Sequence, residues 1–206
     1  MTSKQPFPPG QVDWAGENPG MYLKESETGP FTGLVSFFRV VLSPQGRGHA
    51  LVLIEAPERA ESDADRLNVC VTDNQPMARY LVENFVSAFG AFRGCAGLKG
   101  LVYRKLETVT TAGDHRSTYL ETVIGDGVEA RLSWGGLGEP FMVDMPAASS
   151  ATGKHQMFSL FVESRDAVAT VNGRRLRGRS QPRDFAGRPS TTAFLAFAET
   201  WVKAPA

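Results

Sequence analysis

Apolar runs separated by short turns recur along most of the chain, and this pattern predicts a protein built mainly of β-strands. Residues 31–42 and 49–55 are dense in aromatic and β-branched side chains, and residues 43–48 between them supply proline and glycine. Such an arrangement is typical of a β-hairpin. Because both runs are almost continuously apolar, we expect strands that are covered on both faces, or a bulged strand whose alternation is interrupted.

Shorter segments downstream have the same character. Strands are expected at residues 67–72, 101–110, 116–124, 128–134 and 141–145, followed by a hairpin at residues 157–163 and 167–171. Apolar and polar residues alternate most cleanly at residues 128–134, as one buried and one solvent-exposed face require. Residues 174–180 contain one large apolar side chain and predict an exposed or edge strand. Residues 192–202 fit a strand and a helix almost equally, and we favour a strand.

One segment has helical rather than strand periodicity. Its apolar residues recur at three- and four-residue spacing, namely Met77, Leu81, Phe85, Ala88, Phe89 and Phe92. Asp73 or Asn74 followed by Pro76 is typical of a helix start. We therefore expect one long helix near residues 75–92, packed onto a sheet or closing one end of a barrel.

Together these elements predict a mainly β protein of the α+β class. Short turns that contain glycine favour antiparallel pairing, and a sheet of many strands has to curve to avoid long open edges. We expect an antiparallel barrel-like or strongly curved sheet of about 9–10 strands with one long helix. Residues 1–30 are rich in proline, glycine and short polar residues and predict an N-terminal arm, whereas residues 31–206 predict a single barrel-like domain.

Composition limits the class of protein and its location. The 206 residues are 42% hydrophobic and 21% charged, which is typical of an ordered globular chain. Two cysteines, with no secretory signal at the start of the sequence, favour a reducing cytoplasm. No apolar run approaches the roughly 18 residues that span a bilayer. The net charge of zero removes the general attraction to nucleic acids and anionic membranes, so neither is an expected partner.

Charge is nevertheless uneven along the chain. Residues 55–73 carry six carboxylates and two arginines, whereas residues 165–188 carry seven arginines and two aspartates. Regions of opposite charge can complement each other within one molecule or across a contact between two copies. A homo-oligomer is therefore one of the arrangements that the sequence allows.

No motif in the sequence implies a cofactor or a metal. The glycine-rich nucleotide loops, the zinc-protease helix motif, paired Cys-x-x-Cys and the serine-hydrolase elbow are all missing. The three histidines lie in or beside separate expected turns, and no regular spacing brings two of them onto one face. We therefore expect no bound metal and, in the main interpretation, no cofactor.

Candidate catalytic residues lie on the strand expected at residues 116–124. If the face that carries Glu121 and Tyr119 lines a barrel interior, an apolar environment suits the carboxyl to acid–base work, and Tyr119 can orient a substrate oxygen. The alternative is that Glu121 lies on the wet face, because carboxylates are seldom fully buried. Candidate ligand-binding residues are Trp14, Tyr103, Trp134, Arg174 and Arg177. Arginines bind carboxylates and phosphates, but positive charge also protects an edge strand from pairing.

Three functions remain open at this point. The first is a barrel domain that binds a small, largely apolar or weakly anionic organic molecule, with non-redox chemistry on that ligand left open. The second is an FMN-binding split-barrel oxidoreductase. The third is a non-enzymatic module that associates through its acidic and basic regions. A closed pocket lined by aromatic residues favours the first, a yellow protein the second, and salt-dependent self-association the third.

Overall fold

The computed structural model describes residues 10–61 and 66–203, and β-strands dominate this part of the chain. Within it, thirteen strands form one large sheet and two more form a separate hairpin. The large sheet contains β1 (Gln11–Glu17), β2 (Gly20–Lys24), β3 (Phe31–Leu42), β4 (Gly48–Ile54), β5 (Asn68–Thr72), β6 (Val102–Lys105), β7 (Thr108–Ala112), β8 (Thr118–Gly125), β9 (Val128–Leu137), β10 (Phe141–Met145), β11 (His155–Val171), β12 (Arg174–Arg175) and β15 (Ala193–Lys203). The hairpin is β13 (Pro182–Phe185) and β14 (Arg188–Thr191). The expected mainly β class with one α-helix is confirmed for the described residues.

The large sheet is mixed and has thirteen strands among the described residues, whereas the sequence predicted an antiparallel barrel-like or strongly curved sheet of about 9–10 strands. Its strands follow the order β6-β5-β4-β3-β1-β15-β11-β9-β8-β7, and among the described residues the end strands β6 and β7 do not pair. Four strands, β1, β15, β2 and β3, pair in a ring because β2 bonds to both β15 and β3. β5 and β6 are parallel, since the helical segment between them returns the chain to the same end of the sheet.

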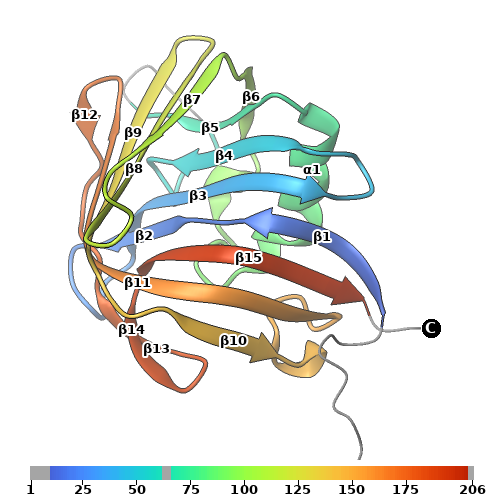
Figure 1. Cartoon of the computed structure of the whole chain (residues 1–206). Coiled ribbons are helices and arrows are strands. Elements are labelled where there is room, and N and C mark those ends of the chain that lie inside the picture. The colour runs from blue at the N-terminus through green and yellow to red at the C-terminus, as the bar shows by residue number, and fades with distance from the viewer. Residues whose placement is uncertain (1–9, 62–65, 204–206) are drawn as a thin grey trace, which may run out of the picture.

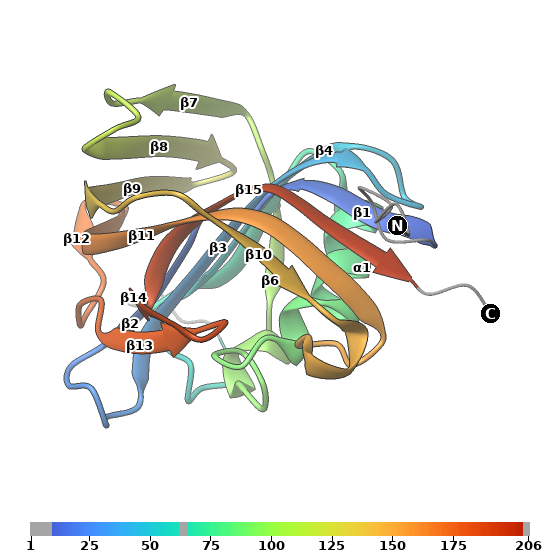
Figure 2. The ribbon, with the colours of Figure 1, turned by 60° about the horizontal axis from the view of Figure 1, so that its bottom comes forward.

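The sheet is covered on both faces, which explains the continuous apolar runs. The helix α1 (Gln75–Asn84) lies on one side of the long central strands, while β7, β8 and β9 lie on the other side (Figure 1, Figure 2). Alternate residues of β3 and β4 therefore enter two different cores. Leu34, Phe38 and Val52 belong to the core on the helix side. Val35 and Phe37 belong to the core shared with β8 and β9.

The α-helix is shorter than the sequence predicted. Asn74 caps it by accepting a hydrogen bond from the backbone N–H of Met77 at 3.1 Å, and Pro76 occupies the first turn. The helix ends before Phe85, whose φ of −128° leaves the helical region, and the 3₁₀ turn η1 (Val86–Ala88) follows. A 3₁₀ helix also brings residues i and i+3 onto one face. The apolar spacing therefore continues beyond the helix without more α-helix.

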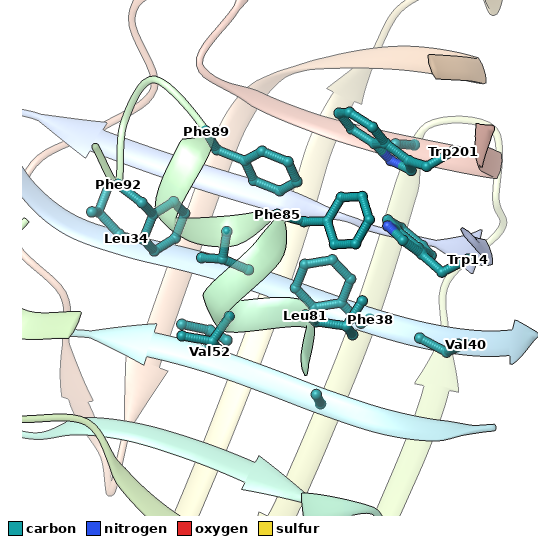
Figure 3. Close-up of a cluster of buried hydrophobic side chains, with 14 of the residues drawn as sticks. Trp14, Leu34, Phe38, Val40, Val52, Leu81, Phe85, Phe89, Phe92 and Trp201 are labelled. Atoms are coloured by element: carbon teal, nitrogen blue, oxygen red, sulfur yellow. The ribbon is translucent and has the colours of Figure 1, made fainter. Parts of the chain in front are cut away.

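Aromatic rings from this helical segment fill the core on the helix side of the sheet. Figure 3 shows Phe85 pointing toward Trp14 and Trp201, with Phe89 beside Trp201. Phe85 meets both indoles edge-on, at centroid distances of 6.0 Å and 5.4 Å, and Phe89 stacks on Trp201 at 5.8 Å. Such pairs add stabilisation beyond the burial of their area. They also hold Phe89 and Trp201 where both line a cavity.

Three expectations for individual segments can be compared with the structure. The described part of the expected arm at residues 1–30 includes β1 and β2, which pair inside the sheet, while residues 1–9 lie outside the described residues. The hairpin expected at residues 157–171 is instead the single strand β11, which pairs first with β15 and then with β9. Ser164 continues this strand, and its Oγ donates to the Gly135 carbonyl at 2.9 Å. Residues 193–203 form a strand, as we favoured.

Candidate functional site

A largely apolar cavity of about 120 Å³ lies on the helix side of the sheet. Half of the residues that line it are phenylalanine, tryptophan or methionine, namely Phe89, Met145, Met157, Phe161, Phe185, Phe194 and Trp201. Five polar side chains also reach it: Asn18, Tyr22, Ser159, Arg183 and Glu199. The exposed Gly90 marks a point where the cavity meets the surface. An apolar cavity with a few convergent polar groups is the usual form of a small-molecule site.

A β-bulge in β15 directs Glu199 into this cavity. Before the bulge, Phe194 and Ala196 face the helix side of the sheet. Ala198 has a positive φ of 50°, and the register between β15 and β11 shifts at this point. One extra residue in a strand reverses the alternation of the residues that follow it. Glu199 and Trp201 therefore face the cavity, whereas an unbulged strand would turn them to the opposite face.

The Glu199 carboxyl is buried and held by two hydrogen bonds. Trp201 Nε1 donates to Glu199 Oε1 at 2.7 Å, and the side chain of Asn18 supplies the second bond. Burial raises the pKa of Glu199 to about 7, while both hydrogen bonds oppose the rise because they stabilise the charged form. At neutral pH the group is divided between acid and carboxylate, which suits an acid–base catalyst.

Hydrogen bonds connect Glu199 to Tyr22 through two buried side chains. Ser36 Oγ donates to Asn18 Oδ1 at 2.5 Å. Because this bond uses the single Ser36 proton, Ser36 Oγ accepts its second bond from the Tyr22 hydroxyl. Asn18 and Ser36 are 2% and 0% exposed. Burial raises the pKa of Tyr22 above its ordinary value, so this hydroxyl stays protonated at neutral pH. The Tyr22 hydroxyl is therefore the first donor of a buried hydrogen-bond chain that ends at the Glu199 carboxyl.

Arg183 is a partly buried cation packed among aromatic rings. Its guanidinium carbon lies 4.8 Å from the ring centre of Phe185, 5.1 Å from that of Phe194 and 6.0 Å from those of Tyr22 and Phe161. Its Nε donates to the Thr191 carbonyl at 2.8 Å. Burial lowers the pKa of Arg183 because the guanidinium loses water. Cation–π attraction to these rings offsets part of the cost of removing the guanidinium from water. No carboxylate in the described part of the chain forms an ion pair with Arg183.

A polar cluster beside the cavity holds the loop at its edge. Asp13 accepts a hydrogen bond from the Tyr80 hydroxyl, and its Oδ2 lies 2.7 Å from His155 Nε2. His155 Nδ1 lies 3.0 Å from Thr152 Oγ1, so the His155 imidazole connects the Thr152 hydroxyl to the Asp13 carboxylate by hydrogen bonds. Thr152 Oγ1 also accepts two backbone N–H groups of its own turn. The cluster therefore anchors to β1 the loop whose residue Ala151 lines the cavity.

The structure brings the two catalytic candidates together, on the opposite side of the sheet from the cavity. Glu121 is 1% exposed, and its Oε1 accepts a hydrogen bond from Arg39 Nη2 at 2.6 Å. The Tyr119 hydroxyl accepts from Arg39 Nη1 at 2.9 Å, and the Thr111 hydroxyl also bonds to Glu121. Tyr119 packs in the core shared with β8 and β9. The carboxylate is thus buried, as a site would require, but it is engaged by a cation of the same chain.

The three aromatic candidates lie apart from each other. Trp14 is buried in the core on the helix side, and Trp134 is buried in the other core, where its Nε1 donates to a backbone carbonyl at 3.0 Å. Tyr103 is half-buried on β6, with the Arg79 guanidinium 4.2 Å from its ring centre. None of the three lines the cavity described above.

The two basic candidates are exposed and engaged by carboxylates of the chain. Arg174 pairs with Glu55 at 3.0 Å, and Arg177 pairs with Glu25 at 2.5 Å. The Arg174 pair joins the basic region to the acidic region within one molecule. Such exposed pairs contribute little to stability, and neither arginine lines the cavity.

The polar residues of the cavity are absent from the candidates drawn from the sequence. Glu199 is the one charged residue between positions 193 and 202, and a carboxylate inside an apolar strand is a signal of burial or function. Arg183 is one of seven arginines in its region, and Tyr22 lies in the expected arm. Neither carries a local signal, because long-range packing places both beside the cavity.

In the ranges that the structure describes, no group of three or more His, Cys, Asp and Glu side chains is placed to hold a metal ion. The same ranges contain no helix long and apolar enough to cross a membrane. Comparison of the chain with protein-family models, with curated proteins and with solved structures finds no match. A functional assignment therefore depends on the chemistry of the cavity.

Proposed function

We propose that the protein binds a small monocarboxylic acid with an apolar body in this cavity. The aromatic wall would contact the body, and the Arg183 guanidinium would pair with the carboxylate. The observation that carries the proposal is a partly buried cation that lines an apolar cavity and has no ion-pair partner among the described residues. Removing a charge from water without a partner is costly. An anionic ligand would supply the missing partner.

The volume of the cavity limits the ligand. It is about 120 Å³, slightly less than the engineered apolar cavity of about 150 Å³ that holds benzene. Drug-sized ligands occupy pockets of about 300 Å³ or more. The ligand therefore has a body of roughly one ring or one short branched chain. Met145 and Met157 in the wall can adapt to its shape, because methionine is flexible and polarisable.

Isothermal titration calorimetry with straight and branched carboxylates, from butanoate to octanoate, tests the proposal. Each acid should bind at least about 10-fold more tightly than the primary alcohol with the same body, since a hydrogen bond to a charged group contributes about 1.5–3 kcal/mol. Arg183→Gln should remove this preference. Arg188→Gln is the matched control, because Arg188 lies on the same hairpin but is exposed and does not line the cavity.

Two results would count against the proposal. Equal affinities for acids and alcohols in the wild type would contradict the role of Arg183, and no binding by any acid in the series would reject the function as a whole. An absorption spectrum, with mass spectrometry of any molecule released on denaturation, provides an independent check. A released flavin would favour the FMN-binding alternative instead.

A further inference from the structure

Two ionisable side chains of opposite charge line the same small cavity from different parts of the fold. Glu199 reaches it from the bulged end of β15, and Arg183 reaches it from the hairpin of β13 and β14. The two do not form an ion pair with each other. The cavity of about 120 Å³ has room for one small molecule. A ligand that fills it therefore contacts both side chains.

The hydrogen bonds of Glu199 come from donors only. Trp201 Nε1 cannot accept a hydrogen bond, and it donates to Glu199 Oε1 at 2.7 Å. Asn18 Oδ1 already accepts from Ser36, so Asn18 reaches Glu199 through its amide N–H group. A proton that binds to Glu199 therefore stays on this carboxyl and does not pass along the hydrogen-bond chain.

We propose that the cavity binds its carboxylic acid together with one proton, which Glu199 takes up from solvent as the ligand enters. Two effects favour the protonated form of Glu199. The apolar body of the ligand excludes water from the carboxyl, and the ligand carboxylate brings a second negative charge into the cavity. The inference rests on the proposed binding function and gives the same site a dependence on pH.

Glu199 is the group at the cavity that can change its charge near neutral pH. Burial places its pKa at about 7. Burial raises the pKa of Tyr22, so its hydroxyl stays protonated, and the Arg183 guanidinium stays charged because arginine does not lose its proton in proteins. The other described side chains that line the cavity do not titrate. On the neighbouring strands β11 and β1, His155 and Asp13 pair with each other at 2.7 Å and do not line the cavity.

The affinity for the acid should therefore fall as the pH rises. Below pH 7 Glu199 already carries the proton before the ligand enters, whereas above pH 7 binding has to restore it. The ligand carboxyl is ionised throughout this range. In isothermal titration calorimetry, the dissociation constant of 4-methylpentanoate should rise at least about 10-fold between pH 6 and pH 8.5.

Two variants show whether this dependence comes from Glu199. Glu199→Gln carries a neutral group at every pH, so its dissociation constant for 4-methylpentanoate should change by less than about threefold over the same range. Glu163→Gln is the matched control, because Glu163 lies on β11 and does not line the cavity. It should keep the pH dependence of the wild type.

Counting the protons in the wild type provides a test that does not require Glu199→Gln to fold. The heat of binding includes the heat with which the buffer releases each proton that the complex takes up. Titrations at pH 7.5 in Hepes and in Tris, which differ in ionisation enthalpy, should therefore give an uptake of about half a proton or more per ligand.

The binding function and the proton linkage fail in different ways. The linkage is overturned, and binding stands, if 4-methylpentanoate binds without proton uptake or equally well at pH 6 and pH 8.5. A folded Glu199→Gln that keeps the pH dependence of the wild type also overturns it. No binding at pH 6 by 4-methylpentanoate or by any other acid of the series would reject the binding function, and the linkage with it.

Discussion

Burial of Glu199 predicts that the folded protein loses stability as the pH rises from 5 to 8, with no ligand present. Desolvation raises the pKa of this carboxyl from an ordinary value of 4.5 to about 7 on folding. A group whose pKa is raised on folding binds its proton more tightly in the folded state. Its contribution to stability is therefore complete below pH 4.5 and is lost as the pH rises through 7. Glu199→Gln removes this contribution at every pH.

The expected magnitude follows from the two pKa values. The difference between 4.5 and 7 corresponds to about 3 kcal/mol in full. Most of it titrates between pH 5 and pH 8, so over this range the free energy of unfolding of the wild type should fall by about 2 to 3 kcal/mol relative to Glu199→Gln. Small proteins are stable by roughly 5–15 kcal/mol in total, so an effect of this size is measurable.

Urea unfolding curves at pH 5, 6, 7 and 8, followed by tryptophan fluorescence, would measure this effect. The difference between wild type and Glu199→Gln cancels the histidines and other carboxyls that titrate in both proteins. Glu163→Gln is the control, because Glu163 lies on β11 and does not line the cavity. The reasoning is refuted if the wild type keeps a constant difference from Glu199→Gln, or gains stability relative to it as the pH rises.

Three further predictions concern other parts of the molecule, and urea unfolding with calorimetric binding measures them. Glu121→Gln should reduce the free energy of unfolding by about 2 kcal/mol, because the hydrogen bond that Arg39 donates to Glu121 would then end on a neutral amide instead of a carboxylate. A changed ligand affinity in this variant would contradict the position of Glu121 outside the cavity. Arg183→Met should abolish the preference for acids without lowering stability, since it replaces an unpaired cation by an apolar chain. Phe85→Ala should lower the free energy of unfolding by about 3–5 kcal/mol, because Phe85 is fully buried. Val41 is 70% exposed, so Val41→Ala should change the free energy of unfolding by no more than about 0.5 kcal/mol. Similar losses in both variants would contradict the assignment of Phe85 to the core.

Local sequence patterns determined most of the strand positions. The runs at residues 31–42 and 49–55 became β3 and β4, and their lack of alternation correctly indicated cover on both faces. The short apolar segment at residues 141–145 became β10 with the expected bounds. These predictions succeed because side-chain period and turn chemistry act within a few residues of each other.

Other features of the fold depend on contacts that no local pattern contains. The spacing of apolar residues did not mark the end of α1, because the 3₁₀ turn that follows presents the same face to the core. The single strand β11 extends through a segment that resembles a turn, since β15 and then β9 supply its hydrogen-bond partners. The parallel pairing of β5 and β6 likewise requires the whole helical crossover.

The cavity shows most clearly what the sequence determined by itself and what only tertiary structure decided. The sequence determined which residue types were present, including two carboxylates, Glu121 and Glu199, on expected strands. Only the fold decided that Glu121 meets Arg39, 82 positions away, and that Glu199 faces an apolar cavity beside Arg183 and Tyr22. The role of a buried carboxyl depends on what lies opposite it, and here those partners come from segments far apart in the chain.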